Sequence, residues 1–250
     1  MFQGKTALVI GATSGMGEAS ARAFAREGAS VVVAGRRVDR GESIAASIRE
    51  AGGEATFLPC DVGSEQSIID VVAGTVARYG RLDCAVNNAA LEIAGGLLHE
   101  RPTADCDAIL AINVRGVFLS MKYQITQMLQ NGGGAIVNVT SSSAHVGFPT
   151  AALYTGTKHA IDGMSKAAAL EYVKLGIRIN CVAPGLMASE MMQRYCDSVG
   201  ITVQDVADTT PIGRPARPEE LASAVLWLCS PGASFAVGTS LVVDGGMIAA

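Results

Sequence analysis

The apolar positions of the chain alternate between two spacings. Short β-branched runs that are apolar on both faces recur along the whole length, and stretches with helical periodicity lie between them. Strands of this kind are typical of a parallel sheet that helices cover on each side. The pattern predicts seven strands, at residues 7–10, 30–34, 55–58, 84–86, 135–139, 177–182 and 240–243.

The helical stretches complete a repeated strand–helix alternation. Ser64 and Thr103 are expected to be N-caps, because a hydroxyl can accept a hydrogen bond from a free first-turn amide, and Asp39 is expected to cap the helix after the second strand. The alternation predicts an α/β, doubly wound fold with a parallel sheet of about seven strands. The predicted helices span residues 17–27, 40–51, 65–79, 104–131 with a break, 151–175 and 218–229.

No linker, charge block or repeat divides the chain, so residues 1–250 are expected to form one domain. Residues 185–215 show neither spacing. We expect an irregular segment there that acts as a substrate lid at about 186–215, with a disordered surface excursion as the alternative.

Composition narrows the class of protein. With 49% apolar and 17% charged residues the chain is not intrinsically disordered, and a net charge of −4 gives no broad basic surface for nucleic acid. No apolar run reaches the roughly 18 residues of a membrane span, and the first residues do not resemble a signal peptide. A cytoplasmic location is expected. The six cysteines form no C-x-x-C pair and no histidine stands at ligand spacing, so neither a metal nor a disulfide is expected.

A glycine-rich turn directly follows the first predicted strand. Its glycines permit a tight turn, a close approach of the backbone to a pyrophosphate and close packing of helix on strand. The next helix begins there and points free N–H groups at the phosphates. With a second strand ending roughly 20 residues later, the turn predicts a dinucleotide site. The predicted contacts are Gly11, Thr13, Ser14, Gly15, Met16 and Gly17.

The end of the second strand favours one dinucleotide. An NAD site usually carries an acidic residue there, whereas Arg36 and Arg37 follow Gly35 in this chain. A guanidinium can bind phosphate oxygens with two parallel hydrogen bonds. The charge pattern therefore favours NADP(H) over NAD(H), with solvated surface arginines as the alternative.

Tyr154 and Lys158 stand four residues apart in a predicted helix and so share a face. Bringing the pKa of a phenol from about 10 to near 7 requires about 4 kcal/mol. An ammonium about 4 Å away at an effective dielectric near 20 supplies a similar amount. We expect Lys158 to lower the pKa of Tyr154, which makes the phenol a general acid or base. An exposed lysine beside a packing tyrosine is the alternative.

Several motifs in fixed order resemble the short-chain dehydrogenase/reductase family in its form of about 250 residues. The resemblance covers essentially the whole chain and implies a Rossmann fold. It also implies a homotetramer built through residues 104–131, residues 151–175 and the last strand, with a dimer as the alternative. The motifs are Gly11-x-x-x-Gly15-x-Gly17, Asn87-Asn-Ala-Ala90, Asn113, a serine after the fifth strand, Tyr154-x-x-x-Lys158 and Pro184-Gly185.

The resemblance implies a catalytic group of Asn113, Ser141, Tyr154 and Lys158. Ser141 is chosen among neighbouring serines because the family's serine precedes its tyrosine by thirteen positions. By resemblance, Tyr154 exchanges a proton with the substrate oxygen and Ser141 hydrogen-bonds that oxygen. Lys158 binds the nicotinamide ribose, and Asn113 holds a water that links Lys158 to solvent.

Further cofactor and substrate contacts also follow from the resemblance. The chain departs from the family pattern at Ile10 and Ala90, where Thr and Gly are usual, and at Ser189, which replaces a usual Thr. The implied cofactor contacts are Asp61, Val62, Asn88, Ala89, Tyr154, Lys158, Pro184, Gly185 and Ser189. The expected substrate contacts are Ser141, His145, Tyr154, Met187 and Met191.

The sequence therefore predicts an NADP(H)-dependent oxidoreductase that interconverts a carbonyl and a secondary alcohol by hydride transfer. One alternative is a reductase of 3-oxoacyl thioesters on an acyl carrier protein, which would need a basic docking patch. Another is a non-catalytic dinucleotide-binding regulator, which would be expected to lack Tyr154 or Lys158, and both are present.

Overall fold

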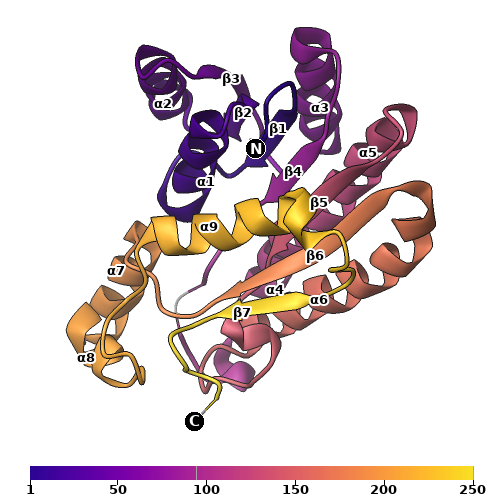
Figure 1. The fold of residues 1–250 in the computed structure, drawn as a ribbon. Helices are drawn as coiled ribbons and strands as arrows, with labels where there is room; N and C mark the ends of the chain where they lie inside the picture. The colour runs from indigo at the N-terminus through magenta and orange to yellow at the C-terminus, as the bar shows by residue number, and fades with distance from the viewer. Residues whose placement is uncertain (94, 250) are drawn as a thin grey trace.

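Seven parallel strands form one sheet in the order β3-β2-β1-β4-β5-β6-β7 (Figure 1). The computed structural model describes residues 1–93 and 95–249, without the side chains of residues 191, 195, 198 and 199 in one helix. All seven predicted strands are present, and the structure lengthens most of them by one or two residues. The strands are β1 (Thr6–Ile10), β2 (Ser30–Gly35), β3 (Glu54–Pro59), β4 (Cys84–Asn87), β5 (Gly134–Val139), β6 (Ile177–Pro184) and β7 (Ser240–Val243).

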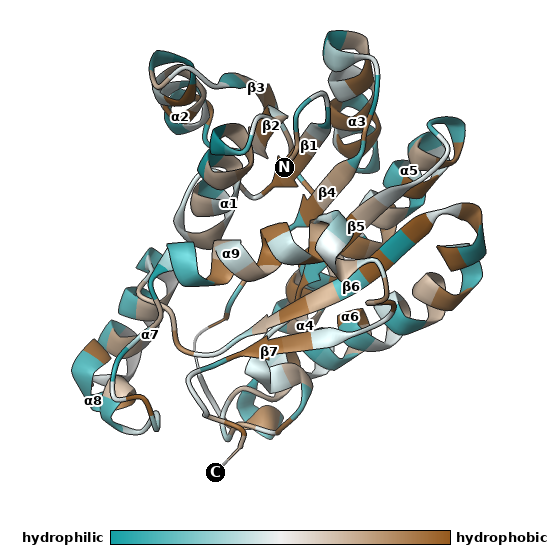
Figure 2. Cartoon of the chain, in the orientation of Figure 1, coloured by the Kyte–Doolittle hydropathy of each residue, from teal (hydrophilic) through white to brown (hydrophobic). Residues whose placement is uncertain are grey.

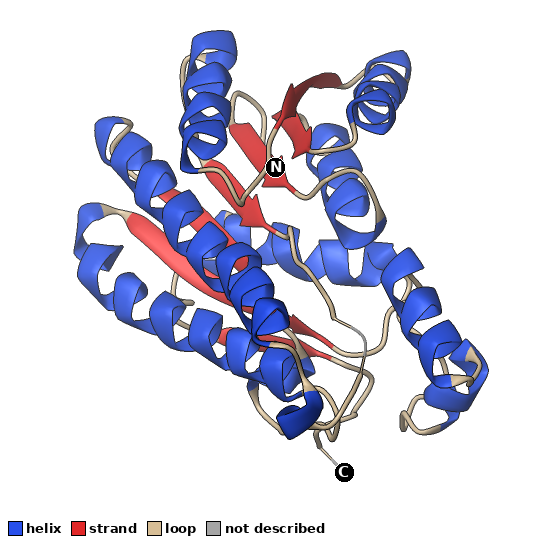
Figure 3. Ribbon diagram, turned by 180° about the vertical axis from the view of Figure 1, so that it is seen from behind, coloured by secondary structure: helices blue, strands red, loops and turns tan. Residues whose placement is uncertain are grey.

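Helices cover both faces of the sheet (Figures 1 and 3). On one face lie α1 (Gly15–Arg26), α2 (Val38–Glu50) and α9 (Pro218–Cys229). On the other lie α3 (Glu65–Tyr79), α5 (Gly116–Gln130) and α6 (Ala152–Tyr172). The doubly wound α/β prediction is confirmed.

The buried strands explain the apolar runs of the sequence. Successive residues of a strand point to opposite faces. In β1, Val9 packs in one core cluster with Phe24 of α1, and Leu8 packs in the other with Ile68 of α3. Both faces of β1 are therefore apolar, and Figure 2 shows hydrophobic strands between helices whose outer sides are hydrophilic.

The edge strand β3 does not follow this pattern. Only Ala55 and Phe57, on alternate positions, are fully buried there. The expectation that every strand is buried on both faces is wrong for β3 and for the other edge strand, β7, whose four residues are all only partly buried, because an edge strand has a neighbour on one side only.

Three predicted helix caps can be checked. Ser64 caps α3, since its hydroxyl accepts a hydrogen bond from the Ser67 amide. The cap predicted at Thr103 is wrong, because α4 (Thr103–Ile109) begins at Thr103 itself and Pro102 precedes it. The cap predicted at Asp39 is also wrong. Asp39 is the second residue of α2, where its charge faces the positive end of the helix dipole.

The break expected within residues 104–131 is a π-helical turn, Leu110–Arg115, between α4 and α5. A π-helical turn inserts an extra residue into the helical repeat and often marks a functional position. Asn113, a predicted site residue, lies within it and is fully buried.

The segment expected to be irregular contains two helices, α7 (Glu190–Val199) and α8 (Val203–Asp208). The Ser189 hydroxyl caps α7 by accepting a hydrogen bond from the Met192 amide, and Thr202 and Asp205 form a capping box at the start of α8. The expectation of irregular structure is therefore wrong, because these local caps stabilise short helices where the apolar pattern is weak.

No helix within residues 1–93 and 95–249 has the length and apolar character needed to cross a membrane. In the same residues, no group of three or more His, Cys, Asp or Glu side chains is arranged to hold a metal ion. The six cysteines are free thiols, and all but Cys106 are buried.

Candidate active site

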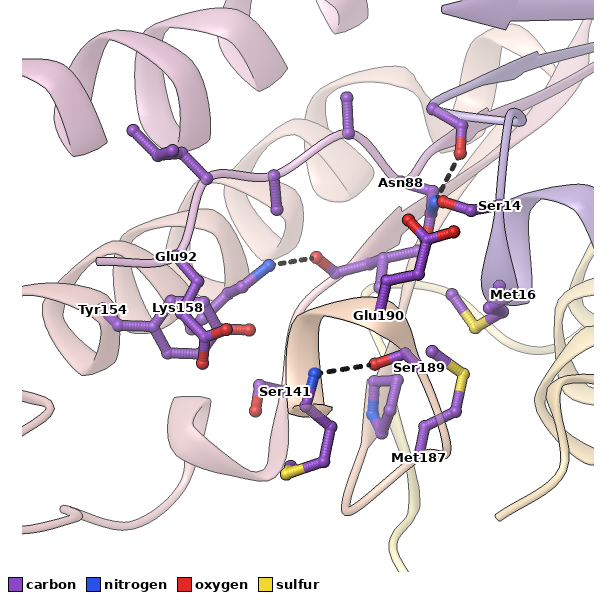
Figure 4. Close-up of a pocket in the computed structure, with 18 of the residues that line it drawn as sticks. Ser14, Met16, Asn88, Glu92, Ser141, Tyr154, Lys158, Met187, Ser189 and Glu190 are labelled. Atoms are coloured by element: carbon purple, nitrogen blue, oxygen red, sulfur yellow. Dashed lines mark hydrogen bonds between the residues drawn. The ribbon is translucent and has the colours of Figure 1, made fainter. Parts of the chain in front are cut away.

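A cavity of about 1000 Å³ opens at the carboxyl ends of the strands. It lies where the strand order reverses between β1 and β4, which is the usual ligand position in an open parallel sheet. In Figure 4, Ser14, Asn88 and Glu190 gather at one end of the cavity, and Glu92, Tyr154 and Lys158 at the other. Residues from both halves of the sequence therefore share one space.

The turn after β1 is shaped by close backbone packing. Gly11 has a φ of +82°, and a Cβ added there would lie 2.5 Å from the Ala89 amide nitrogen. A Cβ at Gly17 would collide with the Gly11 carbonyl oxygen. The Asn88 side chain donates a hydrogen bond of 2.8 Å to the same carbonyl and holds the turn against the end of β4. Both glycines are thus required by the backbone geometry.

The start of α1 is suited to bind an anion. Ser14 is the N-cap, yet its side chain makes no capping hydrogen bond with the first turn. The first-turn N–H groups of a helix have no partner within the helix, and the positive end of its dipole favours negative charge. Five of the six predicted turn residues line the cavity, and only Gly17 lies behind it. This turn fits the pyrophosphate of a dinucleotide.

The two arginines after β2 differ from each other. Arg37 donates to the Thr13 hydroxyl (3.1 Å), the Thr13 carbonyl (3.0 Å), the Ser14 hydroxyl (2.6 Å) and the Glu190 carboxylate (3.0 Å). Arg36 also lines the cavity, and no residue in the described part of the chain pairs with it. Arg37 therefore braces the turn after β1 and is paired with Glu190, whereas Arg36 is not paired within the described residues, and binding of a phosphate by either guanidinium stays a prediction.

Ser141, Tyr154 and Lys158 come together at the other end of the cavity. Ser141 follows β5 and caps a short 3₁₀ turn, in which its hydroxyl accepts a hydrogen bond of 3.2 Å from the Ser143 amide. Lys158 is 2% exposed, donates a hydrogen bond of 3.0 Å to the Val139 carbonyl, and lies 5.3 Å from the centre of the Tyr154 ring. The structure thus unites three of the four residues predicted to be catalytic.

The electrostatics of this group differ from the expectation. Burial raises the pKa of Tyr154 well above its ordinary value, the Glu92 carboxylate raises it further, and the nearby Ser141 hydroxyl acts in the opposite direction. Burial lowers the pKa of Lys158 to about 8. The predicted net lowering of the phenol pKa toward 7 is wrong for the chain's own groups, because the cost of burying a phenolate outweighs the effect of nearby charge. Tyr154 is therefore protonated at neutral pH.

Asn113 lies behind the cavity wall. Its side-chain oxygen accepts a hydrogen bond from the Leu91 amide (2.7 Å), and its side-chain nitrogen donates to the Leu91 carbonyl (2.9 Å). The same nitrogen lies 3.3 Å from the Thr157 hydroxyl. Asn113 therefore fixes the segment that carries Glu92, and its role in a water relay stays a prediction.

Comparison with known proteins decides the family. A family model described as "Enoyl-(Acyl carrier protein) reductase" matches residues 11–248. The chain is 40% identical over 249 residues to a 2,5-dichloro-2,5-cyclohexadiene-1,4-diol dehydrogenase of Sphingobium indicum, covering 99% of this chain and 98% of that protein. The chain belongs to the short-chain dehydrogenase/reductase family.

Solved structures of short-chain dehydrogenases/reductases share the fold. Levodione reductase superposes with a TM-score of 0.97 at 30% identity over 100% of both chains. A variant of actinorhodin polyketide ketoreductase with NADPH superposes with a TM-score of 0.92 at 35% identity over 99% of both. The predicted resemblance and Rossmann fold are confirmed, and the class is that of dehydrogenases and reductases acting on alcohol and ketone groups.

The remaining predicted cofactor residues of this short-chain dehydrogenase/reductase lie along the cavity. Asp61 and Val62 line it after β3, and the Asp61 carboxylate accepts a hydrogen bond from the Gly63 amide. Ser189 lines it at the start of α7, and a Cβ at Gly185 would lie 2.7 Å from the Asp244 Cα. Ala89 and Pro184 complete the set.

The predicted substrate contacts have mixed outcomes. Met187 lines the cavity, as do Ser141 and Tyr154. The side chain of Met191 lies outside the described residues. His145 is exposed, does not line the cavity, and its ring Nε2 lies 3.0 Å from the Ser240 hydroxyl. The prediction for His145 is wrong, because the 3₁₀ turn after Ser141 directs the ring toward β7.

Several cavity residues carry no prediction from the sequence. Glu190 and Arg194 both come from α7, Arg40 comes from α2, and Met247 follows β7. Glu92, by contrast, is a candidate for the substrate wall from its position after the Asn87-Asn88 turn, and it does line the cavity. It is partly buried, burial raises the pKa of its carboxyl group, and it has no hydrogen-bond partner among the residues described. The four-residue spacing of Glu190 and Arg194 after a capping serine is the signal that would have identified a helix at this position.

Proposed function

We propose that the protein is an NADP(H)-dependent oxidoreductase that interconverts a carbonyl and a secondary alcohol, with Tyr154 as the general acid and base. The observation that carries this proposal is the shared cavity. The glycine turn after β1 and the group of Ser141, Tyr154 and Lys158 line the same space. A dinucleotide bound along the turn would reach the phenol within that space.

When bound, a nicotinamide dinucleotide supplies or accepts the hydride. The chain's own residues handle the proton. In reduction the protonated Tyr154 phenol gives its proton to the carbonyl oxygen, and in oxidation the phenolate takes it back. The Ser141 hydroxyl holds the same oxygen beside the phenol. The Lys158 ammonium, next to the Tyr154 ring, would hold the nicotinamide ribose and stabilise the phenolate when it forms.

Arg36 supports NADP(H) as the cofactor. It lines the cavity at the end of β2 and has no partner among the described residues, so its guanidinium is available to a 2′-phosphate. No acidic residue stands at the end of that strand to bind a free ribose hydroxyl. The similarity to a ketoreductase solved with NADPH agrees with this choice.

A small, largely apolar ketone or alcohol is the substrate class we propose. Leu91, Phe148, Met187, Met192 and Val206 supply apolar surface to the cavity, and thioether side chains adapt to varied shapes. The relatives named above act on a cyclohexadiene diol, on levodione and on a polyketide, so a ring-bearing substrate fits this class.

The two alternative functions are less well supported. A reductase of 3-oxoacyl thioesters would need cations to dock an acidic carrier, but the arginines after β2 face the dinucleotide end of the cavity, and two of them pair with Glu190. A non-catalytic regulator would not require Tyr154 and Lys158 to converge with Ser141 in the cavity.

We also propose that residues 1–250 act as one domain in a cytoplasmic homotetramer, with residues 186–215 as the substrate lid. Phe118 and Leu129 on α5 and Leu170 on α6 are exposed apolar side chains, and burial in an interface between subunits would stabilise the assembly. Sedimentation velocity measures the assembly, and a monomer at micromolar concentration would contradict it.

The function is tested by a panel of ketones followed through nicotinamide absorbance with NADPH and with NADH. We expect at least one cyclic ketone to be reduced, with a higher kcat/KM for NADPH. Arg36→Ala is expected to lower kcat/KM for NADPH by about tenfold or more and to leave the NADH value nearly unchanged. Arg26→Ala, an exposed charge on α1 outside the cavity, is the control.

Equal values for both cofactors in the wild type and in Arg36→Ala would refute the cofactor assignment. No cofactor oxidation with any ketone would favour the regulator.

A further inference from the structure

Glu190 joins the lid to the cations that follow β2. It is the first residue of α7, yet one carboxylate oxygen accepts a hydrogen bond of 3.0 Å from Arg37 and the other accepts one of 3.0 Å from Arg40. All three side chains line the cavity. These residues are about 150 positions apart in the sequence, so only the fold brings them together.

We propose that Glu190 determines dinucleotide specificity, because its carboxylate competes with an adenosine 2′-phosphate for Arg37 and Arg40 and so weakens NADP(H) relative to NAD(H). The inference rests on the proposed dinucleotide function. It assigns to a lid residue the acidic group that an NAD site usually carries at the end of the second strand.

The hydrogen bonds at this end of the cavity already occupy most of the N–H donors of Arg37 and pair Arg40 with a carboxylate. A guanidinium has five N–H donors, and Arg37 makes four hydrogen bonds, three to Thr13 and Ser14 and one to Glu190. Arg40 pairs with Glu190 and lies 3.8 Å from Glu18. Of the three arginines Arg36, Arg37 and Arg40, only Arg36 has a guanidinium without a partner in the described residues.

A phosphate and a hydroxyl respond differently to this carboxylate. A 2′-phosphate carries negative charge and is repelled by Glu190 when both approach the same guanidiniums. A ribose 2′-hydroxyl is neutral, so it suffers no such repulsion. Arg37, Arg40 and Arg194 all hold the pKa of Glu190 below its usual value, which keeps the carboxylate ionised at neutral pH.

The pairs are about half exposed, which limits the size of the effect. Exposed ion pairs contribute up to about 1 kcal/mol each and are screened by salt. We therefore expect the carboxylate to change the relative affinity for a 2′-phosphate by about fivefold at low ionic strength, and much less near 1 M salt.

Calorimetric titration with 2′,5′-ADP and with AMP tests the proposal without any turnover. Glu190→Gln keeps the size of the side chain and removes its charge. It is expected to tighten 2′,5′-ADP about fivefold or more at low salt, and to leave AMP within about twofold of the wild type. Glu190→Ala is expected to shift the ratio in the same direction.

Glu42→Gln is the matched control, since Glu42 is an exposed residue of α2 and lies outside the cavity lining. The ratio of its dissociation constants for 2′,5′-ADP and AMP is expected to equal that of the wild type. Binding of both nucleotides with the same ratio in wild type and in both Glu190 variants would overturn the inference alone. No binding of either nucleotide to any form would overturn the dinucleotide function and this inference with it.

Discussion

The burial of Lys158 predicts a specific dependence of stability on pH. Its side chain is 2% exposed, and burial lowers its pKa from 10.5 to about 8. The folded state therefore disfavours the charged ammonium relative to the unfolded chain. This destabilisation is fully present below about pH 8 and disappears as the pH rises toward the unfolded value.

The magnitude follows from the two pKa values. A difference of about 2.5 corresponds to about 3.4 kcal/mol at 1.36 kcal/mol per unit. Lys158→Met keeps an unbranched chain and removes the titrating group. From pH 7 to pH 10, we expect the unfolding free energy of the wild type to rise by about 2.5 kcal/mol relative to the variant. The lost hydrogen bond to Val139 adds an offset that does not vary with pH, because a neutral amine also donates.

Urea unfolding at pH 7, 8, 9 and 10, followed by circular dichroism, measures this difference. Lys174→Met removes an exposed lysine in the turn after α6 and is the control, which is expected to follow the wild type at every pH. A difference in unfolding free energy between wild type and Lys158→Met that stays constant from pH 7 to pH 10 would show that charging Lys158 in the folded state does not lower stability.

Three further results are expected. Because burial raises the pKa of Tyr154, kcat/KM for ketone reduction should stay nearly level from pH 6 to 8, while kcat/KM for alcohol oxidation rises with pH; parallel profiles would contradict this assignment. Asn113→Ala leaves two partly buried backbone groups of Leu91 without their partners and should lower the unfolding free energy measured in urea by about 1 kcal/mol or more. An unchanged value would show that the contact is dispensable. Gly11→Ala should weaken dinucleotide binding, measured by titration, more than tenfold. Gly52 shares a φ near +85° but has open space around it, so Gly52→Ala should leave the affinity unchanged. An equal loss of affinity in both variants would attribute the effect to backbone strain alone.

The strands and several helices could be predicted because the buried side of each element leaves a regular spacing of apolar residues in the sequence. The bounds predicted for residues 65–79 and 218–229 match α3 and α9. Each helix has a clear start signal, which is the capping Ser64 before α3 and Pro218 at the first position of α9. The helices α7 and α8 were not predicted, since each is short and its capping residues lie within a segment of weak periodicity.

The candidate site shows a similar division. The residues of the glycine turn and the pair of Tyr154 and Lys158 are recognisable because fixed spacing places them. Two other properties depend on tertiary structure. The pKa of Tyr154 is set by how deeply the fold buries the phenol and by the charge of Glu92. Arg37 and Glu190 pair although they are 153 positions apart in the sequence, and the spacing of residues along the chain cannot predict such a contact.

Replacement of Tyr154 by Phe tests the central claim most directly, since it removes only the phenolic hydroxyl. The measurement is the rate of nicotinamide absorbance change with a ketone identified in the panel, alongside the dissociation constant of the dinucleotide. We predict a loss of at least about 100-fold in kcat, since positioned proton transfer contributes about 10² to 10⁴, and a dinucleotide affinity within about twofold of the wild type. Tyr172→Phe, at the far end of α6, should behave as the wild type. Turnover of Tyr154→Phe within about tenfold of the wild type would contradict the assignment of Tyr154 as the proton donor.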